Sequence, residues 1–123
     1  MKNTSKSIST TEISFINHAS FAFFSKNLKI LSDPWYWGDA FDSGWRLIYE
    51  NPIEEVETLL QEITHIYLSH EHPDHFSVAF FYKFKKLIIK NDIKIIFQST
   101  RDQRVYKFFN KMGVKIIQLN HKK

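Results

Sequence analysis

Four residues that could bind a metal lie within six positions of one another in the segment HEHPDH. They are His70, His72, Asp74 and His75, three imidazoles and one carboxylate. In extended backbone, side chains two residues apart project the same way, so His70 and His72 can approach one ion. Asp74 and His75 follow and can reach a second ion nearby. Imidazole and carboxylate ligands suit a divalent metal, with zinc expected and iron or manganese as alternatives. The sequence has no cysteine, which excludes a thiolate site.

A predicted strand and a predicted helix flank this segment. The preceding run from Thr64 to Ser69 is apolar and rich in residues that favour strands. The following residues, 77–90, place phenylalanine, leucine and isoleucine at helical spacing. The sequence therefore predicts that the metal-binding residues occupy a loop at the carboxyl end of a strand.

The rest of the chain predicts a mixed α/β fold. Three short β-prone runs at 12–16, 20–25 and 29–32 suggest a meander. Residues 33–50 contain all three tryptophans and show no helical or strand period, which is typical of a functional loop. From Pro52 onward, helices alternate with strands, and this alternation implies a parallel sheet with crossover helices. The last predicted elements are a strand at 93–97, a helix after Thr100 and a strand at 114–119.

Two helix starts carry capping signals. Asn51 precedes Pro52 and has an acidic residue, Glu54, three positions later, which predicts a capping box. Thr100 and Gln103 have the same spacing ahead of the next helix. We therefore expect the Asn51 and Thr100 side chains to accept hydrogen bonds from the first turns of these helices.

Composition limits the classes of partner. The formal net charge is +4, and the lysines are dispersed, so we expect no nucleic-acid partner. The first ten residues are polar and lack the apolar core of a secretory signal, and no apolar run reaches the length of a membrane span. We expect a cytoplasmic protein with a flexible tail over residues 1–11 and one domain over residues 12–123.

The pattern His-x-His-x-Asp-His, between a strand and a helix, resembles the signature of the metallo-β-lactamase fold hydrolases. The resemblance extends from about Glu12 to Leu119 and implies the N-terminal half of an αββα sandwich. The segments 17–21, 32–35 and 40–45 (NHASF, SDPW and AFDSGW) resemble the branch related to the C-terminal domain of CMP-N-acetylneuraminate hydroxylase. An iron–sulfur module is excluded because the sequence has no cysteine.

The resemblance implies roles for individual residues. His70 and His72 would hold one metal, and Asp74 and His75 would hold the second. Asp74 would also orient the attacking water and so act in catalysis. The resemblance places the turn at His18 beside the metals, where it would contact the substrate, although a histidine that only closes the turn fits equally well. Trp35, in the tryptophan-rich loop, is the second residue expected to contact the substrate.

The resemblance also implies that the local ligands are too few for two metals. The family's remaining ligands lie in the second half of the fold, beyond Leu119, and His121 is not expected to replace them. Two hypotheses follow. The first is a metal-dependent hydrolase of a phosphorylated or nucleotide-linked small molecule, completed by a complementary C-terminal half or by a second copy of the chain. The second is a truncated, catalytically incomplete metal-binding domain with no turnover on its own.

Overall fold

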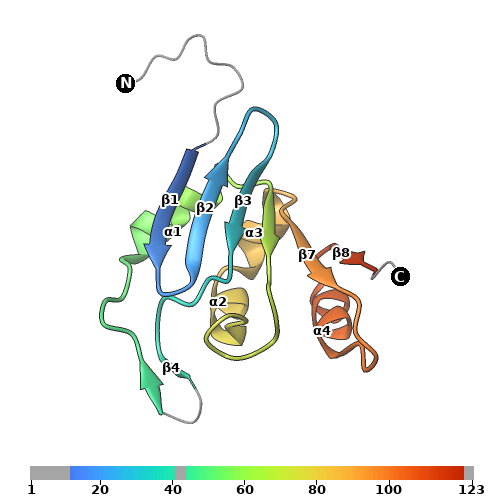
Figure 1. The fold of residues 1–123 in the computed structure, drawn as a ribbon. Helices are drawn as coiled ribbons and strands as arrows, with labels where there is room; N and C mark the ends of the chain where they lie inside the picture. Colours follow the sequence, from blue (N-terminus) through green and yellow to red (C-terminus); the bar gives the residue numbers. More distant parts are fainter. Residues whose placement is uncertain (1–11, 41–43, 121–123) are drawn as a thin grey trace.

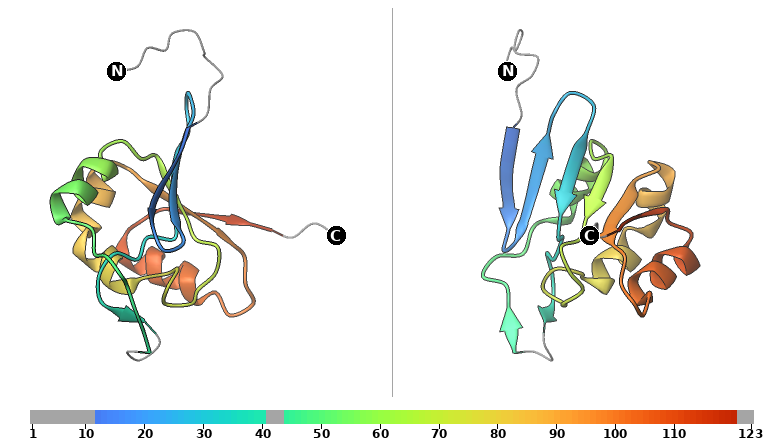
Figure 2. Two further views of the ribbon diagram at one scale, coloured as in Figure 1. Left: turned by 60° about the vertical axis from the view of Figure 1, so that its left-hand side comes forward. Right: turned by 45° about the vertical axis from the view of Figure 1, so that its right-hand side comes forward.

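The fold is a mixed α/β structure built on one six-stranded sheet (Figure 1). A computed structural model describes residues 12–40 and 44–120. The predicted tail and His121 lie outside these residues. The strand order is β1-β2-β3-β6-β7-β8, and the helices lie on one side of the sheet, as the turned view shows (Figure 2). This architecture agrees with the predicted α/β class.

The first three strands form the predicted antiparallel meander. They are β1 (Glu12–Asn17), β2 (Ser20–Phe24) and β3 (Lys29–Ser32). Ala22 pairs with Leu31, and both side chains are fully buried against the helices. Their neighbours on the strands point to the opposite face because side chains alternate along a strand.

The second part of the chain alternates helices with parallel strands. The elements are α1 (Ile53–Leu60), β6 (His65–Tyr67), α2 (Val78–Lys83), α3 (Lys85–Lys90), β7 (Lys94–Gln98), α4 (Arg104–Met112) and β8 (Ile116–Leu119). Strand β6 pairs in parallel with β3 on one side and with β7 on the other, and β8 extends the parallel region. Consequently β3 and β6 end at the same edge of the sheet, where the segment 70–75 begins.

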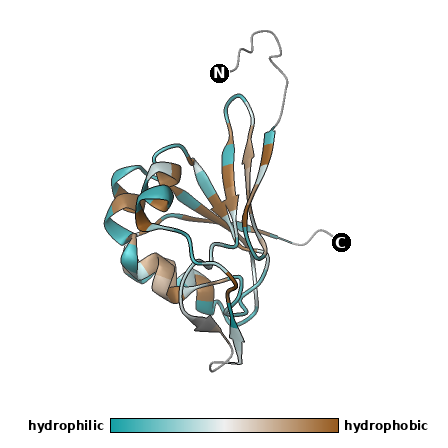
Figure 3. Ribbon diagram, turned by 90° about the vertical axis from the view of Figure 1, so that its left-hand side faces the viewer, coloured by the Kyte–Doolittle hydropathy of each residue, from teal (hydrophilic) through white to brown (hydrophobic). Residues whose placement is uncertain are grey.

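Aromatic side chains fill the space between the sheet and the helices. Phe81 packs edge-to-face on Phe80 and Phe109, at centroid distances of 5.1 and 4.8 Å. Tyr36 is fully buried beneath them, and its hydroxyl lies 2.7 Å from the Ser20 hydroxyl. Burial raises the pKa of Tyr36 well above its ordinary value, so it stays neutral. Figure 3 shows hydrophobic and hydrophilic residues alternating along the covering helices, as amphipathic helices require.

The helix predicted over residues 77–90 is two helices. Phe84 separates α2 from α3 and has the non-helical dihedral angles φ −105° and ψ 17°. The buried residues Phe80, Phe81, Phe84 and Ile88 keep a helical spacing across this break. The spacing of the hydrophobic residues therefore gives no sign of the break between the two helices.

Both predicted capping boxes are wrong. Asn51 Oδ1 accepts a hydrogen bond from Asn17 Nδ2, and α1 begins after Pro52 without a side-chain cap. At α4 it is Asp102 that accepts the Arg104 backbone N–H, at 3.2 Å. This hydrogen bond stabilises the charged carboxylate more than any other contact does, and it holds the pKa of Asp102 below its ordinary value. At α1 the predicted cap residue, Asn51, binds a distant residue instead. At α4 a neighbouring residue, Asp102, takes the place of the predicted cap.

The segment 33–50 is also more regular than predicted. It contains a two-stranded antiparallel sheet of β4 (Asp39–Ala40) and β5 (Trp45–Arg46). Elsewhere in the segment, Trp37 Nε1 donates to the Asn51 carbonyl at 2.9 Å and anchors the loop to the start of α1. Among the described residues, no helix is long and apolar enough to cross a membrane.

The face of the sheet opposite the helices carries apolar side chains exposed to solvent. Ile13 and Phe15 of β1 are 62% and 63% exposed, and Ile117 and Leu119 of β8 are 41% and 47% exposed. Phe97 of β7 does not contribute to this face, because it is buried on the helical side. Exposed apolar surface of this kind favours association.

We predict that the 123-residue chain associates through this open face. Replacing Phe15 with Ser should shift the protein towards monomer, because it removes an exposed ring from the centre of β1. The matched control is Tyr82→Ser, which removes an equally exposed ring (63%) from α2, on the other side of the sheet. Sedimentation velocity over a concentration series measures the effect. A wild-type protein that stays monomeric at high concentration would contradict this prediction.

Candidate metal centre

His18 is positioned by the tight turn between β1 and β2. Its backbone has a φ of +32°, in the left-handed region. Asn17 holds the turn, because its Oδ1 accepts the His18 N–H at 2.8 Å and its Nδ2 donates to Asn51 Oδ1 at 2.8 Å. The His18 ring stands edge-on to Trp35 at 5.0 Å and to Trp45 at 6.0 Å. These contacts direct the imidazole towards the segment that follows β6.

Asp33 joins the ends of β3 and β6. Its backbone N–H donates to the Tyr67 carbonyl at 2.9 Å. Its carboxylate accepts the Ser69 N–H and the Ser69 hydroxyl, both at 2.8 Å, and Oδ2 lies 3.1 Å from His75 Nδ1. Asp33 is buried and has a φ of +40°. Its side chain thus binds residues more than thirty positions away, a role that no local pattern in the sequence indicates.

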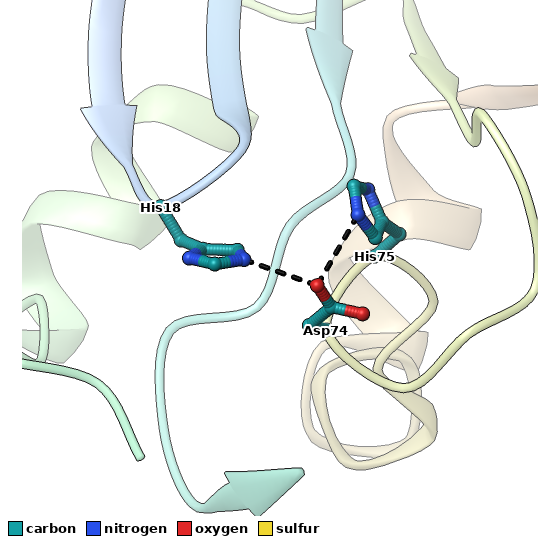
Figure 4. Close-up of side chains that lie close together, drawn as sticks. All are labelled: His18, Asp74 and His75. Atoms are coloured by element: carbon teal, nitrogen blue, oxygen red, sulfur yellow. Dashed lines mark hydrogen bonds and ion pairs between the residues drawn. The ribbon is translucent and has the colours of Figure 1, made fainter. Parts of the chain in front are cut away.

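Asp74 and His75 lie in the segment after β6, which doubles back as a turn. The His75 and Phe76 N–H groups both donate to the His72 carbonyl, at 2.9 and 2.8 Å. The turn carries the Asp74 carboxylate beneath His18, and Asp74 is 5% exposed. One oxygen, Oδ2, lies 3.1 Å from His18 Nε2 and 3.3 Å from His75 Nε2 (Figure 4). Within the described part of the chain, His18, Asp74 and His75 form a group whose potential ligand atoms all lie within 4.8 Å of one another.

The donor set fits a divalent metal ion. We assign the Nδ1 proton of His75 to the bond with Asp33, which is the usual partner of a metal-binding histidine. In that tautomer Nε2 has a lone pair, and it faces the Asp74 oxygen, which is also an acceptor. A cation between these two acceptors would satisfy both. Two imidazoles and one carboxylate are ligands that zinc and non-haem iron share.

His70 and His72 lie beside this group. The His70 ring is 4.0 Å from the His75 ring and 4.7 Å from the His72 ring, centroid to centroid. Ser69 Oγ lies 3.0 Å from His70 Nδ1 and contributes to its orientation. All four residues predicted from the signature therefore gather at the end of β6. Their division between two ions, His70 with His72 and Asp74 with His75, stays a prediction.

The turn at His18 was expected beside the metals, but His18 was not expected to be a candidate ligand. We expected it to contact substrate or only to close a turn, and the structure places its Nε2 among the potential metal ligands. The signal in the sequence was weak, because His18 is 56 residues from Asp74. Trp35 is buried and packs on His18, with its indole N–H donated to the Gly38 carbonyl at 3.1 Å. Its predicted contact with substrate stays a prediction.

Sequence comparison shows similarity to one family and to one group of enzymes. The pattern that defines the beta-lactamase superfamily domain matches residues 12–122. Over 109 residues, 89% of this chain, the sequence is 32% identical to cytidine monophosphate-N-acetylneuraminic acid hydroxylase of Xenopus laevis. It is 31% identical to the inactive human form of that protein. The chain spans 18% and 21% of the lengths of these two relatives.

Two solved structures share the fold. One is described as a possible metal-dependent hydrolase from Veillonella parvula, with a TM-score of 0.58 and 20% identity over 89% of this chain and 40% of that chain. The other is the E377D mutant of the CmlA β-hydroxylase, with a TM-score of 0.57 and 12% identity over 99% of this chain and 22% of that chain. At these identities the structures support the fold alone, and a mixed six-stranded sheet is consistent with part of a metallo-β-lactamase fold.

Removing the shared carboxylate should remove the metal. We predict that Asp74→Asn lowers zinc affinity by about a hundredfold, and that His18→Ala lowers it by about tenfold. His65→Ala is the control, because His65 lies on β6 and hydrogen-bonds Thr64 instead. Elemental analysis after dialysis against defined free zinc gives the stoichiometry and the affinity. Zinc retained unchanged by both His18→Ala and Asp74→Asn would show that the ion lies elsewhere.

Asp33 should support the site without binding the metal. Asn at position 33 keeps the size and tolerates the positive φ, but it lacks the charge that holds His75. We predict that Asp33→Asn weakens zinc binding about tenfold and lowers the free energy of unfolding by about 1–3 kcal/mol. The control Asp92→Asn, also at a positive φ of +53° but exposed and paired with lysines, should leave zinc affinity unchanged. Zinc titration and urea unfolding measure the two effects. Equal zinc affinities of Asp33→Asn and Asp92→Asn would contradict the role of Asp33 in supporting the metal site.

Proposed function

This chain belongs to the beta-lactamase superfamily, and on that basis we propose that it is part of a metal-dependent hydrolase acting on a phosphorylated or nucleotide-linked small molecule. The observation that carries the proposal is the shared contact of Asp74 Oδ2 with His18 and His75. A buried carboxylate between two imidazoles is an arrangement suited to holding a metal ion and a water molecule.

Each residue of the group has a role in this proposal. A bound divalent ion lowers the pKa of water and polarises the scissile bond of the substrate. His18 and His75 would hold the ion through Nε2, and Asp33 would fix the orientation of His75. Asp74 would bind the ion and orient the attacking water, which is the catalytic role that the signature implies. Zinc as the ion and the cytoplasm as the compartment are part of the same proposal.

We propose that further ligands come from a second segment of polypeptide. A two-metal mechanism needs enough ligands for both ions and a group that bridges them. The described residues offer one cluster of three ligands, with His70 and His72 beside it. The open apolar face provides a surface on which a complementary C-terminal half could pack. A second copy of the chain is the alternative partner.

The donor set also supports a second candidate. Two histidines and one carboxylate are the ligands of many non-haem iron oxygenases. The Xenopus laevis protein to which this chain is similar is named as a hydroxylase. This chain spans only 18% of its length, so the name indicates only that iron should be tested beside zinc.

Activity should depend on the second segment and on Asp74. We predict near-background hydrolysis of bis(p-nitrophenyl) phosphate by the 123-residue chain with zinc or manganese, because the three-ligand cluster and its two neighbouring histidines are too few ligands for a bridged pair of ions. Adding the polypeptide that supplies the further ligands should restore hydrolysis, and Asp74→Ala should abolish it, whereas Asp92→Ala should not.

Three other results would contradict this prediction or favour another function. Chelator-sensitive hydrolysis by the chain alone, lost in Asp74→Ala, would show that its own ligands are sufficient. Oxygen consumption that requires iron, with no hydrolysis in any combination, would favour the oxygenase. Metal binding without turnover in any combination would favour a catalytically incomplete domain.

A further inference from the structure

A groove of about 720 Å³ lies beside the candidate metal centre. It is formed where the segment after β6, the start of α2 and the start of α4 come together, in the lower part of Figure 1. Its volume is in the range of small-molecule sites. The groove contains His72 and Pro73 but not His18, Asp74 or His75, so it adjoins the three-ligand group without including it.

Four aromatic side chains line the groove. They are those of Trp35, Trp37, Phe76 and Phe108. Phe76 and Phe108 are fixed edge-to-face at 5.3 Å. Both indole N–H groups already donate to carbonyls within the loop, at 3.1 and 2.9 Å. The rings are therefore held in place, and rigid aromatic walls favour a flat ring as ligand.

Two carboxylates neutralise the Arg104 cation at the rim of the groove. Arg104 donates to Glu71 at 2.7 Å, across the mouth between α4 and the segment after β6. It also pairs with Asp102 at 3.0 Å. With the guanidinium paired to two carboxylates, the groove offers little net attraction to a phosphate. Its occupant should therefore be uncharged.

Trp35 connects the groove with the candidate metal centre. The same indole that lines the groove stands 5.0 Å from the His18 ring. A ligand with an uncharged ring in the groove could therefore extend past Trp35 and place an anionic group near His18 and Asp74. The two ends of the site thus differ in chemistry, apolar at one end and metal-binding at the other.

We propose that this groove binds the base of a nucleotide-linked substrate, as an uncharged planar ring held between Trp35, Trp37, Phe76 and Phe108. The proposal rests on the proposed function for the identity of the substrate, but ring binding itself requires neither metal nor turnover.

The test measures binding by the full 123-residue chain in the presence of a chelator. Adenosine and cytidine are the probes, and tryptophan fluorescence is the signal, because two of the three tryptophans line the groove. Both nucleosides should quench the fluorescence saturably. Ribose 5-phosphate, which has no ring of this kind, and 1-hexanol, which is uncharged and largely apolar but not planar, should not.

A groove-filling variant tests the location. Ala79 is exposed at the start of α2 and lines the groove, so Ala79→Phe should occupy it without disturbing the core. We expect about tenfold weaker nucleoside binding, the equivalent of losing one stacking contact. Thr58→Phe, which adds the same ring to the exposed side of α1, is the control and should bind as the wild type does.

The results separate this inference from the proposed function. Absence of saturable nucleoside binding, equal binding of 1-hexanol, or equal affinities of Ala79→Phe and Thr58→Phe would overturn the inference and leave metal-dependent hydrolysis standing. In the opposite case, the protein binds nucleosides, loses that binding in Ala79→Phe, and hydrolyses no substrate. That result would support nucleoside binding in the groove and reject the proposed function.

Discussion

The buried carboxylate of Asp33 is the contact on which the candidate site depends. It accepts both Ser69 donors and faces His75 Nδ1, so it ties the end of β3 to the segment that follows β6. Burying a carboxylate costs free energy of desolvation unless its oxygens accept hydrogen bonds, and here several donors offset that cost. The left-handed backbone at Asp33 is the local strain that this arrangement requires. Among the contacts to His75 Nδ1, the one from Asp33 is the shorter, at 3.1 Å against 3.3 Å from the Ser69 hydroxyl, and it directs the ring towards Asp74.

The topology of the sheet explains why distant residues meet at this point. Strands β3 and β6 are parallel neighbours, so both end at one edge. The antiparallel turn between β1 and β2 reaches the same edge and brings His18 over Asp74 (Figure 4). The site therefore combines a parallel crossover unit, which supplies the segment 70–75, with a meander that supplies His18. The aromatic core behind the sheet holds both parts rigid, and the groove opens where that core reaches the surface.

Sequence reasoning predicted the elements that depend on local pattern. The meander, the alternating helices and strands, and the metal-binding segment after a strand all follow from hydrophobic periodicity and from the spacing of His70 to His75. The prediction failed where a distant residue is the partner, as at Asn51, which binds Asn17 instead of capping α1. It also failed at Phe84, because the buried residues keep a helical spacing across the break between α2 and α3. His18 joins Asp74 across 56 residues, a contact that no local pattern encodes. The groove likewise arises from segments whose proximity only the fold reveals.

The central claim is that His18, Asp74 and His75 hold a metal ion together. Anomalous diffraction from crystals of the zinc-loaded chain, recorded on both sides of the zinc edge, tests this claim most directly. The account predicts an ion about 2 Å from His18 Nε2, Asp74 Oδ2 and His75 Nε2. The same peak should be absent in crystals of Asp74→Asn. An ion bound by His70 and His72 alone, with His18 still hydrogen-bonded to Asp74, would contradict the account, as would crystals without a zinc peak at this edge of the sheet.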